Sequence, residues 1–412
     1  MNGSFRKLAL QAAVSLALLG GFGGASAIVN VQCPGDTDGD AVIDDFTDPN
    51  YLAHPTATCM HLIAGDGFAV MSDGSEMYTF GFGDQTGTPP NQVIANGILN
   101  NEWVAPTIEL EEGDEFYLSL TNVGTTMRPD LFDSHTVHFH GFPNAATVFD
   151  GVPEVSISIN MGSTLTYYYN IAEPGTHFYH CHVEVTEHME MGMEGNLYIH
   201  PRQDRDGCAG GACPVAERMG GETTAPMGYV YNDDDGTTAW DVEKAIMLVG
   251  FDSAFHEASL NVQPLPFSTI ESDYPMFNGR GYPDTVNTNF TTKAALSPEP
   301  SQKLDSYIEV TAGQKVLLRL SNLSLDRLFT LTAPGLTLKQ VGKDARLMRG
   351  ADGKNLYVEM ASLNSGGGEH AEVLIDTTGV APGTYFLQTT ELHQMSNRNQ
   401  MDGGMITEIV VN

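Results

Sequence analysis

Two short segments of this 412-residue chain concentrate side chains that bind metal ions. The first reads His135-Thr-Val-His138-Phe-His140-Gly141, and the second reads His177-Phe-Tyr-His180-Cys181-His182 and is followed by His188. Together they hold seven of the chain's 13 histidines. A lone buried histidine is usually a hydrogen-bonded core residue, but seven histidines beside one cysteine indicate a metal-binding protein.

Strand geometry divides these residues into two groups. Successive side chains of a β-strand point to opposite faces, so residues two apart share a face. Cys181 therefore points away from its neighbours His180 and His182. In a regular strand His135 likewise faces away from His138. The spacing predicts two metal sites that lie back to back on one pair of strands.

The first group mixes soft and borderline ligands. It consists of the Cys181 thiolate, the His135 and His188 imidazoles and the Met193 thioether. Two histidines and a cysteine with a weak axial methionine are the ligands of a blue copper site, which transfers single electrons. Met191 is a rival for the axial position, although the spacing from His188 favours Met193. Zinc is the competing metal, but a structural zinc site rarely uses methionine.

The second group offers imidazoles alone. Its members are His138, His140, His180 and His182. Imidazole suits copper, zinc, iron or nickel, and the neighbouring blue site favours copper. We expect His177 to pack or to orient a neighbour, and Asp150 either to support a ligand or to form a turn.

These motifs resemble the copper-binding motifs of the multicopper oxidases. The resemblance rests on His-x-x-His-x-His-Gly, on His-Cys-His and on the downstream His and Gly-Met, all within residues 135–193. It implies that the first group binds a type 1 copper and that the second is half of a type 2/type 3 cluster. It also implies an oxidoreductase in which the Cys-His peptide links carry electrons from the first site to the second, and on to oxygen or nitrite.

The sequence departs from the family pattern in two respects. The step from Cys181 to His188 is seven positions, longer than is usual in the family and shorter than in copper nitrite reductases. In the second half, Gln388-Thr-Thr390 stands where a second His-Cys-His would be. The usual cluster of histidines from both halves therefore cannot be assembled from motifs. Either His370 or His393 could complete a site, including that of a neighbouring subunit in a homo-oligomer.

Short runs rich in Val, Ile, Tyr, Phe and Thr alternate with Gly, Pro, Asp and Asn turns, which predicts an all-β protein. Two matches between the halves, Leu120-Thr-Asn122 with Leu320-Ser-Asn322 and Pro174-Gly-Thr-His-Phe178 with Pro382-Gly-Thr-Tyr-Phe386, suggest a duplication. With the family resemblance, this gives two Greek-key cupredoxin β-sandwich domains.

We expect a signal peptide over 1–27, an acidic leader over 28–59, a copper-binding domain over 60–203, a linker with a cysteine loop over 204–240, and a second domain without copper motifs over 241–412.

The signal peptide predicts export to the periplasm or the exterior, where disulfides form. Cys33 could pair with Cys59, and Cys208 with Cys213, which leaves Cys181 free for metal. Alternating aspartates at 36, 38 and 40 could bind calcium or form a solvated acidic loop. No later segment is apolar enough to span a membrane.

A surface with a formal net charge of −33 repels nucleic acid and would attract cations or basic redox proteins, although such a charge also serves general solubility. A small molecule, a metal ion or a cytochrome could therefore donate electrons. The alternative to an oxidase is an electron carrier or copper-storage protein, in which Met189, Met191 and Met193 would hold Cu(I).

Overall fold

A computed structural model of the chain describes residues 29–143, 146–261, 264–289, 302–398 and 400–412. The predicted signal peptide, residues 1–27, lies outside these described residues. Over the described ranges, no helix has both the length and the apolar character needed to cross a bilayer.

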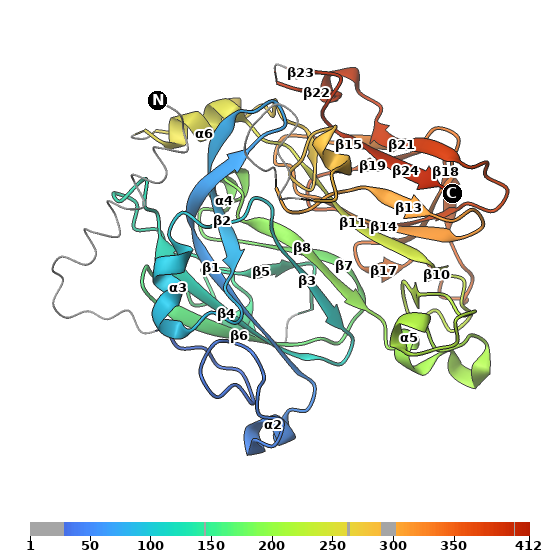
Figure 1. Ribbon diagram of the computed structural model, residues 1–412, viewed down its shortest axis with the longest axis horizontal. Coiled ribbons are helices and arrows are strands. Elements are labelled where there is room, and N and C mark those ends of the chain that lie inside the picture. The colour runs from blue at the N-terminus through green and yellow to red at the C-terminus, as the bar shows by residue number, and fades with distance from the viewer. Residues whose placement is uncertain (1–28, 144–145, 262–263, 290–301, 399) are drawn as a thin grey trace.

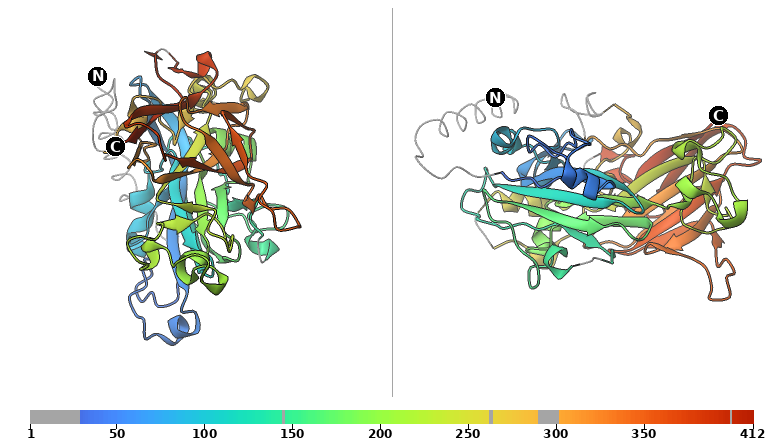
Figure 2. Two further views of the ribbon diagram at one scale, coloured as in Figure 1. Left: turned by 90° about the vertical axis from the view of Figure 1, so that its right-hand side faces the viewer. Right: turned by 90° about the horizontal axis from the view of Figure 1, so that it is seen from below.

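The chain folds into two β-sandwich lobes that lie side by side, which confirms the predicted fold class (Figures 1 and 2). The first lobe, residues 57–200, pairs one sheet in the order β2-β1-β4-β6 with another in the order β3-β8-β7-β5. Its strands are β1 (Ala57–Val70), β2 (Glu76–Asp84), β3 (Ala105–Glu111), β4 (Glu115–Gly124), β5 (His138–His140), β6 (Thr164–Asn170), β7 (Gly175–His180) and β8 (Glu194–His200).

The second lobe, residues 242–411, also has two sheets. One follows the order β12-β11-β14-β20-β16-β17, with β18 also on β16, and the other follows β13-β24-β21-β15-β19. The strands are β11 (Val242–Val249), β12 (Met276–Phe277), β13 (Ile308–Val310), β14 (Lys315–Asn322), β15 (Phe329–Thr332), β16 (Leu338–Lys343), β17 (Arg346–Leu347), β18 (Val358–Met360), β19 (Ser362–Ser365), β20 (His370–Asp376), β21 (Gly383–Thr389) and β24 (Ile406–Val411).

The two lobes repeat one topology. In the first, β4 pairs in parallel with β1 and antiparallel with β6, and in the second β14 pairs in parallel with β11 and antiparallel with β20. Likewise β7 lies antiparallel to β8, as β21 does to β24. The sequence matches at 120–122 and 320–322 therefore fall on equivalent strands, as do those at 174–178 and 382–386. This equivalence is what a duplicated domain requires.

Helices and small ribbons occupy the connections. The α-helices are α2 (Pro49–Ala53), α3 (Pro90–Gly97), α4 (Val185–Glu190), α5 (Gln203–Asp206) and α6 (Ser253–Ser259), and the short ribbons are β9 (Gly228–Tyr229) with β10 (Ala239–Trp240) and β22 (Ser396–Asn397) with β23 (Gln400–Met401). One-turn 3-10 helices are η1 (Thr147–Phe149), η2 (Ala209–Gly211), η3 (Glu217–Met219), η4 (Phe267–Thr269), η5 (Asp284–Val286) and η6 (Leu392–Gln394). Of these, α4 lies between β7 and β8 and carries His188, a residue of the first predicted group.

Disulfides form as the cysteine count predicted. Cys33 bonds to Cys59 at the start of β1, and Cys208 bonds to Cys213 in the segment between the lobes. Cys181 is left as a free, buried thiol. The first bond fastens the acidic leader to the first lobe.

A buried cation joins the two lobes. Arg319 of β14 is fully buried and donates from Nε to Glu243 Oε1 at 2.5 Å, and its guanidinium lies 5.1 Å from the ring centre of Tyr198 on β8. Beside it, the buried Glu372 accepts a hydrogen bond of 2.8 Å from the Thr176 backbone N–H on β7. Since a buried charge is tolerated only when it is paired, this arrangement fixes how the second lobe sits against β7 and β8.

We expect Arg319→Met to lower the free energy of unfolding by about 3–5 kcal/mol, because it leaves buried carboxylates without their cation. Arg346→Met is the matched control, since Arg346 also bridges the lobes through Glu173 but is mostly exposed. It should cost less than about 1 kcal/mol. Urea unfolding of both variants measures the difference, and equal losses would show that the buried cation contributes no more to stability than the exposed one.

Candidate metal centre

The structure brings three of the four residues of the first group together around the Cys181 sulfur. Cys181 Sγ lies 3.3 Å from His188 Nδ1 and 3.9 Å from His135 Nδ1. One ligand atom from each of the three lies within 4.8 Å of the others, and all three side chains are buried. The predicted thiol-and-imidazole group is therefore present in space.

Local backbone structure sets these positions. His135 forms an isolated bridge with Ile159 just before β5, and Cys181 follows the last residue of β7. The chain then turns through α4, which carries His188, and returns along β8. The Cys181 N–H donates to Met193 O at 3.0 Å, and the Met193 N–H donates to His188 O at 2.8 Å.

Met193 and Met191 are both fully buried in the core around Cys181. Their backbones differ in what they contact. Met193 is hydrogen-bonded to Cys181 and His188, whereas Met191 O accepts from the Phe80 N–H at 2.9 Å on β2. The backbone thus ties Met193 directly to the thiol group.

Burial and nearby charge have opposite effects on the pKa of His188. Burial disfavours the protonated ring, but the Cys181 sulfur and the Asp133 carboxylate outweigh that effect and raise the pKa of His188 to about 10. Asp133 Oδ2 lies 3.9 Å from His188 Nε2. Burial also places the pKa of His135 well below its usual value. A metal ion at this group would displace a proton from His188.

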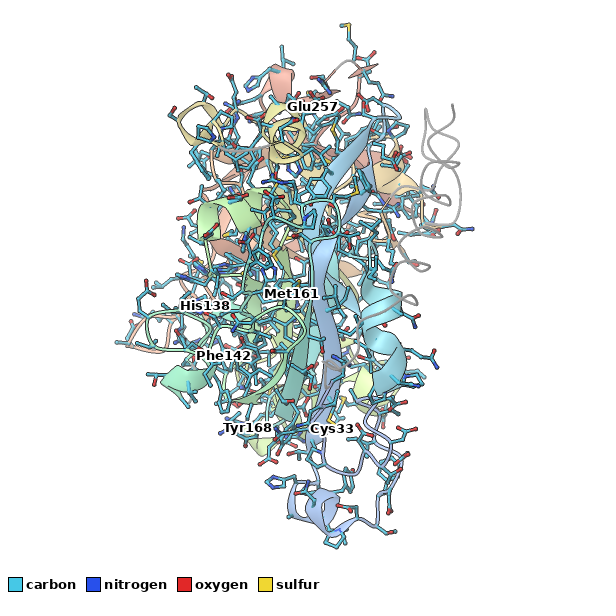
Figure 3. The ribbon with its side chains drawn as sticks, turned by 90° about the vertical axis from the view of Figure 1, so that its left-hand side faces the viewer. Cys33, His138, Phe142, Met161, Tyr168 and Glu257 are labelled. Carbon is cyan, nitrogen blue, oxygen red and sulfur yellow. A yellow bond between two sulfur atoms is a disulfide. The ribbon has the colours of Figure 1, made fainter. Side chains whose placement is uncertain are left out.

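The second group lies on the other side of the same strands. β5 pairs with β7 so that His138 is opposite His180, and ligand atoms of His138, His140 and His180 lie within 4.8 Å of one another. The His182 ring lies 5.2 Å from that of His138 and 5.7 Å from that of His180, between centroids. The alternation of faces predicted from the sequence thus separates the eight residues into two groups. His138 lies midway along the molecule in Figure 3, above Phe142.

Two of these rings are held by backbone carbonyls. His138 Nδ1 lies 2.6 Å from Asp150 O, and His180 Nδ1 lies 2.8 Å from Cys181 O. A ring that donates from Nδ1 keeps Nε2 free as a ligand. Asp150 therefore acts on His138 through its carbonyl, at the end of η1.

The histidine cluster opens onto a cavity of about 400 Å³ between the lobes. One wall consists of the four cluster histidines with Phe178, Val185 and Met189, and the other consists of Leu323, Ser324, Leu325, Gly367 and Gly368. The second wall was not predicted, because it comes from two loops of the second lobe that carry no motif.

Burial disfavours the protonated form of three of the cluster rings. It lowers the pKa of His180 to about 3 and lowers the pKa values of His138 and His140, with further lowering by neighbouring rings. Neutral imidazole is the form that binds metal ions.

The two late histidines differ in location. The His370 ring is buried, and its centroid lies 5.6 Å from that of the His140 ring of the same chain. The His393 side chain, in contrast, is 61% exposed and lies near Glu391. A neighbouring subunit is thus not required to bring His370 to the cluster.

The acidic leader brings carboxylate oxygens of Asp36, Asp38 and Asp40 within 4.8 Å of one another. Asp36 already accepts hydrogen bonds from three backbone N–H groups, those of Asp38, Gly39 and Ala41. Calcium binding here stays a prediction. A further group, Glu109, His200 and Glu243, was missed by the sequence reasoning because its members come from three separate strands.

The donor sets fit copper. A buried thiol within 4 Å of two imidazole nitrogens, with a thioether residue bonded to the same backbone, offers the soft and borderline ligands of a blue copper site. Converging imidazoles with Nε2 left free suit a second copper. In addition, the buried His188 Nε2 has no hydrogen-bond partner among the described residues.

Two family models described as multicopper oxidase match the chain, over residues 84–204 and 250–412. Among curated proteins, the iron transport multicopper oxidase FET3 of Gibberella zeae is 30% identical over 139 residues, which are 33% of this chain and 20% of that protein. L-ascorbate oxidase of Cucurbita pepo var. melopepo is 32% identical over 117 residues, 28% of this chain and 20% of that protein. The matches thus span a fifth of these relatives' length.

Solved structures resemble the whole two-lobe arrangement. A blue copper oxidase from Nitrosomonas europaea covers 86% of both chains with a TM-score of 0.60 and 22% identity. A copper nitrite reductase from the same organism covers 86% of this chain and 94% of its own, with a TM-score of 0.55 and 16% identity. At these identities the likeness establishes the fold alone.

Thiol counting tests the arrangement around Cys181. Copper-free protein should react with an aromatic disulfide reagent only after denaturation, and then at about one thiol per chain, because two disulfides consume the other four cysteines. Prior reduction should expose all five. A count of zero in the unreduced, denatured protein would mean that Cys181 is itself in a disulfide.

Proposed function

The chain belongs to the multicopper oxidase family, and from this premise we propose that it is an exported copper-dependent oxidoreductase that takes electrons at Cys181 and delivers them to an acceptor at the histidine cluster. His135, Cys181, His188 and Met193 hold a type 1 copper in this proposal. His138, His140, His180 and His182 hold further copper. The acceptor is oxygen, with nitrite as the alternative.

One observation carries the proposal. Cys181 lies between His180 and His182 in the chain, and these two rings belong to a cluster that faces a cavity of about 400 Å³. The thiol and the cavity-facing imidazoles are thus joined by single peptide links. His180 Nδ1 also lies 2.8 Å from the Cys181 carbonyl, which adds a hydrogen-bonded connection between the two groups.

Copper supplies one-electron redox chemistry at both groups when it is bound. The surrounding residues keep the Cys181 group apart from bulk water. Burial of Cys181, His135 and His188 holds the first group in one geometry, which lowers the rearrangement that accompanies electron transfer. The cavity leaves room for a small acceptor beside the cluster, whereas the Cys181 side has only core residues around it.

Charge on the His188 side favours a cationic donor. The Asp133 carboxylate faces His188 Nε2, and the whole chain carries a net charge of −33. Such a surface attracts a metal cation or a basic cytochrome more strongly than an anionic donor. The methionines do not form one cluster for Cu(I) storage, because Met189 lines the histidine cavity while Met191 and Met193 lie in the core around Cys181.

Two substitutions separate the two groups. Cys181→Ser should abolish an intense blue absorption band, because that band requires the copper–thiolate bond. His138→Ala should keep the blue band, lose about one copper per chain and stop oxygen or nitrite consumption. Metal analysis and an absorption spectrum of each purified variant give these results.

His393→Ala is the matched control, because this histidine is exposed and distant from both groups in the chain. It should keep the copper content, the blue band and the turnover. An unchanged spectrum in Cys181→Ser would refute the ligand assignment. One copper with a blue band and no turnover in the unsubstituted protein would identify an electron carrier instead.

The axial ligand can be assigned by potential. Met193→Leu should retain the blue band and raise the reduction potential of the blue site, because a thioether that stabilises Cu(II) is removed. Met191→Leu is the matched control and should change neither property. Spectroelectrochemical titration measures both, and a shift in Met191→Leu alone would make Met191 the ligand.

A further inference from the structure

One further group of metal-ligating side chains lies apart from the two groups described above. Ligand atoms of Glu109 on β3, His200 on β8 and Glu243 on β11 all lie within 4.8 Å of one another. β8 and β11 adjoin where the two lobes meet (Figure 1). Because β7 runs antiparallel to β8, His200 at the end of β8 lies near the start of β7, whereas His180 of the histidine cluster ends β7. The three residues therefore form a separate group.

Two carboxylates converge on the same nitrogen of the His200 ring. Glu109 Oε2 accepts from the Tyr198 hydroxyl at 2.9 Å, and its Oε1 lies 2.9 Å from His200 Nε2. Glu243 Oε1 accepts from Arg319 Nε at 2.5 Å, and its Oε2 lies 3.5 Å from His200 Nε2. A ring nitrogen carries at most one hydrogen, so it can donate well to only one of these oxygens. A cation bound at this point would be shared by all three atoms.

The other nitrogen of the same ring is buried without a partner. His200 is 1% exposed, and its Nδ1 has no hydrogen-bond partner among the described residues. Asp204 Oδ2 lies 3.7 Å from it, and Arg218 Nε donates to that oxygen at 2.9 Å. A metal-bound histidine usually donates its second ring N–H to a carboxylate. A small movement of the ring toward Asp204 would form that hydrogen bond and leave Nε2 as the metal ligand.

Negative charge exceeds positive charge around this ring. Four carboxyl groups interact with His200, those of Glu109, Glu111, Asp204 and Glu243. Two guanidinium groups face them. Arg218 pairs with Glu111 and Asp204, and Arg319 pairs with Glu243 but also faces Glu372. Because buried charges need partners, an ion with two positive charges would balance the two carboxylates in excess.

The donor types and their spacing fit zinc. Zinc binds imidazole nitrogen and carboxylate oxygen at about 2.0–2.2 Å in a tetrahedron, which places its ligand atoms about 3.3 Å apart. The two distances to His200 Nε2, 2.9 Å and 3.5 Å, lie on either side of that value. Calcium and magnesium prefer oxygen ligands alone. The Glu109 side chain is 55% exposed, so an ion can enter from solvent and water can supply the fourth ligand.

We propose that Glu109, His200 and Glu243 hold one zinc ion that fastens the first lobe to the second. The ion joins β3 and β8 to β11, beside the buried Arg319. This site is separate from both candidate copper groups, and the proposal does not rest on the proposed function.

Zinc binding to the full chain tests this site. Metal-free protein and its variants Glu109→Gln and His200→Gln are dialysed to equilibrium against zinc sulfate, and mass spectrometry gives the zinc bound per chain. Each variant should bind about one zinc ion fewer than the unsubstituted protein, because it lacks one of three protein ligands. Zinc bound by the histidine cluster is common to all of these proteins and cancels in the comparison.

Glu111→Gln is the matched control. Glu111 lies two residues beyond Glu109 on the same face of β3 and pairs with Arg218, but it is not one of the three ligands. The substitution removes the same charge and should leave the zinc content unchanged. Zinc should also raise the melting temperature of the unsubstituted protein and of Glu111→Gln more than that of Glu109→Gln, because an ion stabilises the state that binds it.

Equal zinc content in the unsubstituted protein, Glu109→Gln and His200→Gln overturns the proposal. That result is expected if a protonated His200 bridges the two carboxylates without a metal. An equal loss of zinc in Glu111→Gln also overturns it, because the loss would then follow charge and not ligation. Glu109→Gln alters a half-exposed side chain at constant size, so it decides the question if His200→Gln does not fold. The blue band of copper-loaded Glu109→Gln should match that of the unsubstituted protein.

Discussion

The candidate metal centre depends on the direction in which three consecutive side chains point. At the end of β7 the backbone sends Cys181 to one side and the imidazoles of His180 and His182 to the other, because side chains alternate along an extended chain. The pairing of His138 with His180 fixes this register on one edge, and the bond from the Cys181 N–H to Met193 O fixes it beyond the strand. A slip of one residue would exchange the thiol and the imidazoles between the two groups.

The repeated topology shows what the second lobe has in place of a copper site. The end of β21 corresponds to the end of β7, and Thr389 stands where Cys181 stands in the first lobe. Thr389 is buried and donates a hydrogen bond of 2.6 Å to Gln394 Oε1. An uncharged, hydrogen-bonded polar pair therefore occupies this position. The fold thus requires no metal there, and the proposed copper ligands of the first lobe are an addition to a sandwich that packs without them.

Much of the fold and of the first group could be predicted from the sequence. Strands and turns follow from local composition, the duplication follows from two repeated motifs, and one unpaired cysteine follows from an odd count in a chain that is expected to be exported. The division into two groups needed only the alternation of strand faces. In each case the sequence signal lies within a few neighbouring residues. In His180, Cys181 and His182, for example, the spacing alone sets the face of the strand to which each side chain points.

The rest of the site could not be read in this way. Asp133, the cavity wall at Leu323–Leu325 and the glycines before His370 come from loops without periodicity, and their role depends on how the lobes pack. Contacts between distant segments carry no signal in a single sequence without homologues.

Packing of the two lobes sets the size and position of the cavity beside the histidine cluster. Gly368 lies so close to the cluster that a Cβ there would be 3.6 Å from His140 Nε2, and Arg319 with Glu243 and Glu372 holds the second lobe against β7 and β8. Buried charges fix geometry more strictly than apolar contacts do. The wall of the cavity therefore cannot move away from the histidines without exposing or unpairing these buried charges. The second lobe thus forms one wall of the cavity beside the histidine cluster, although it has no copper motif of its own.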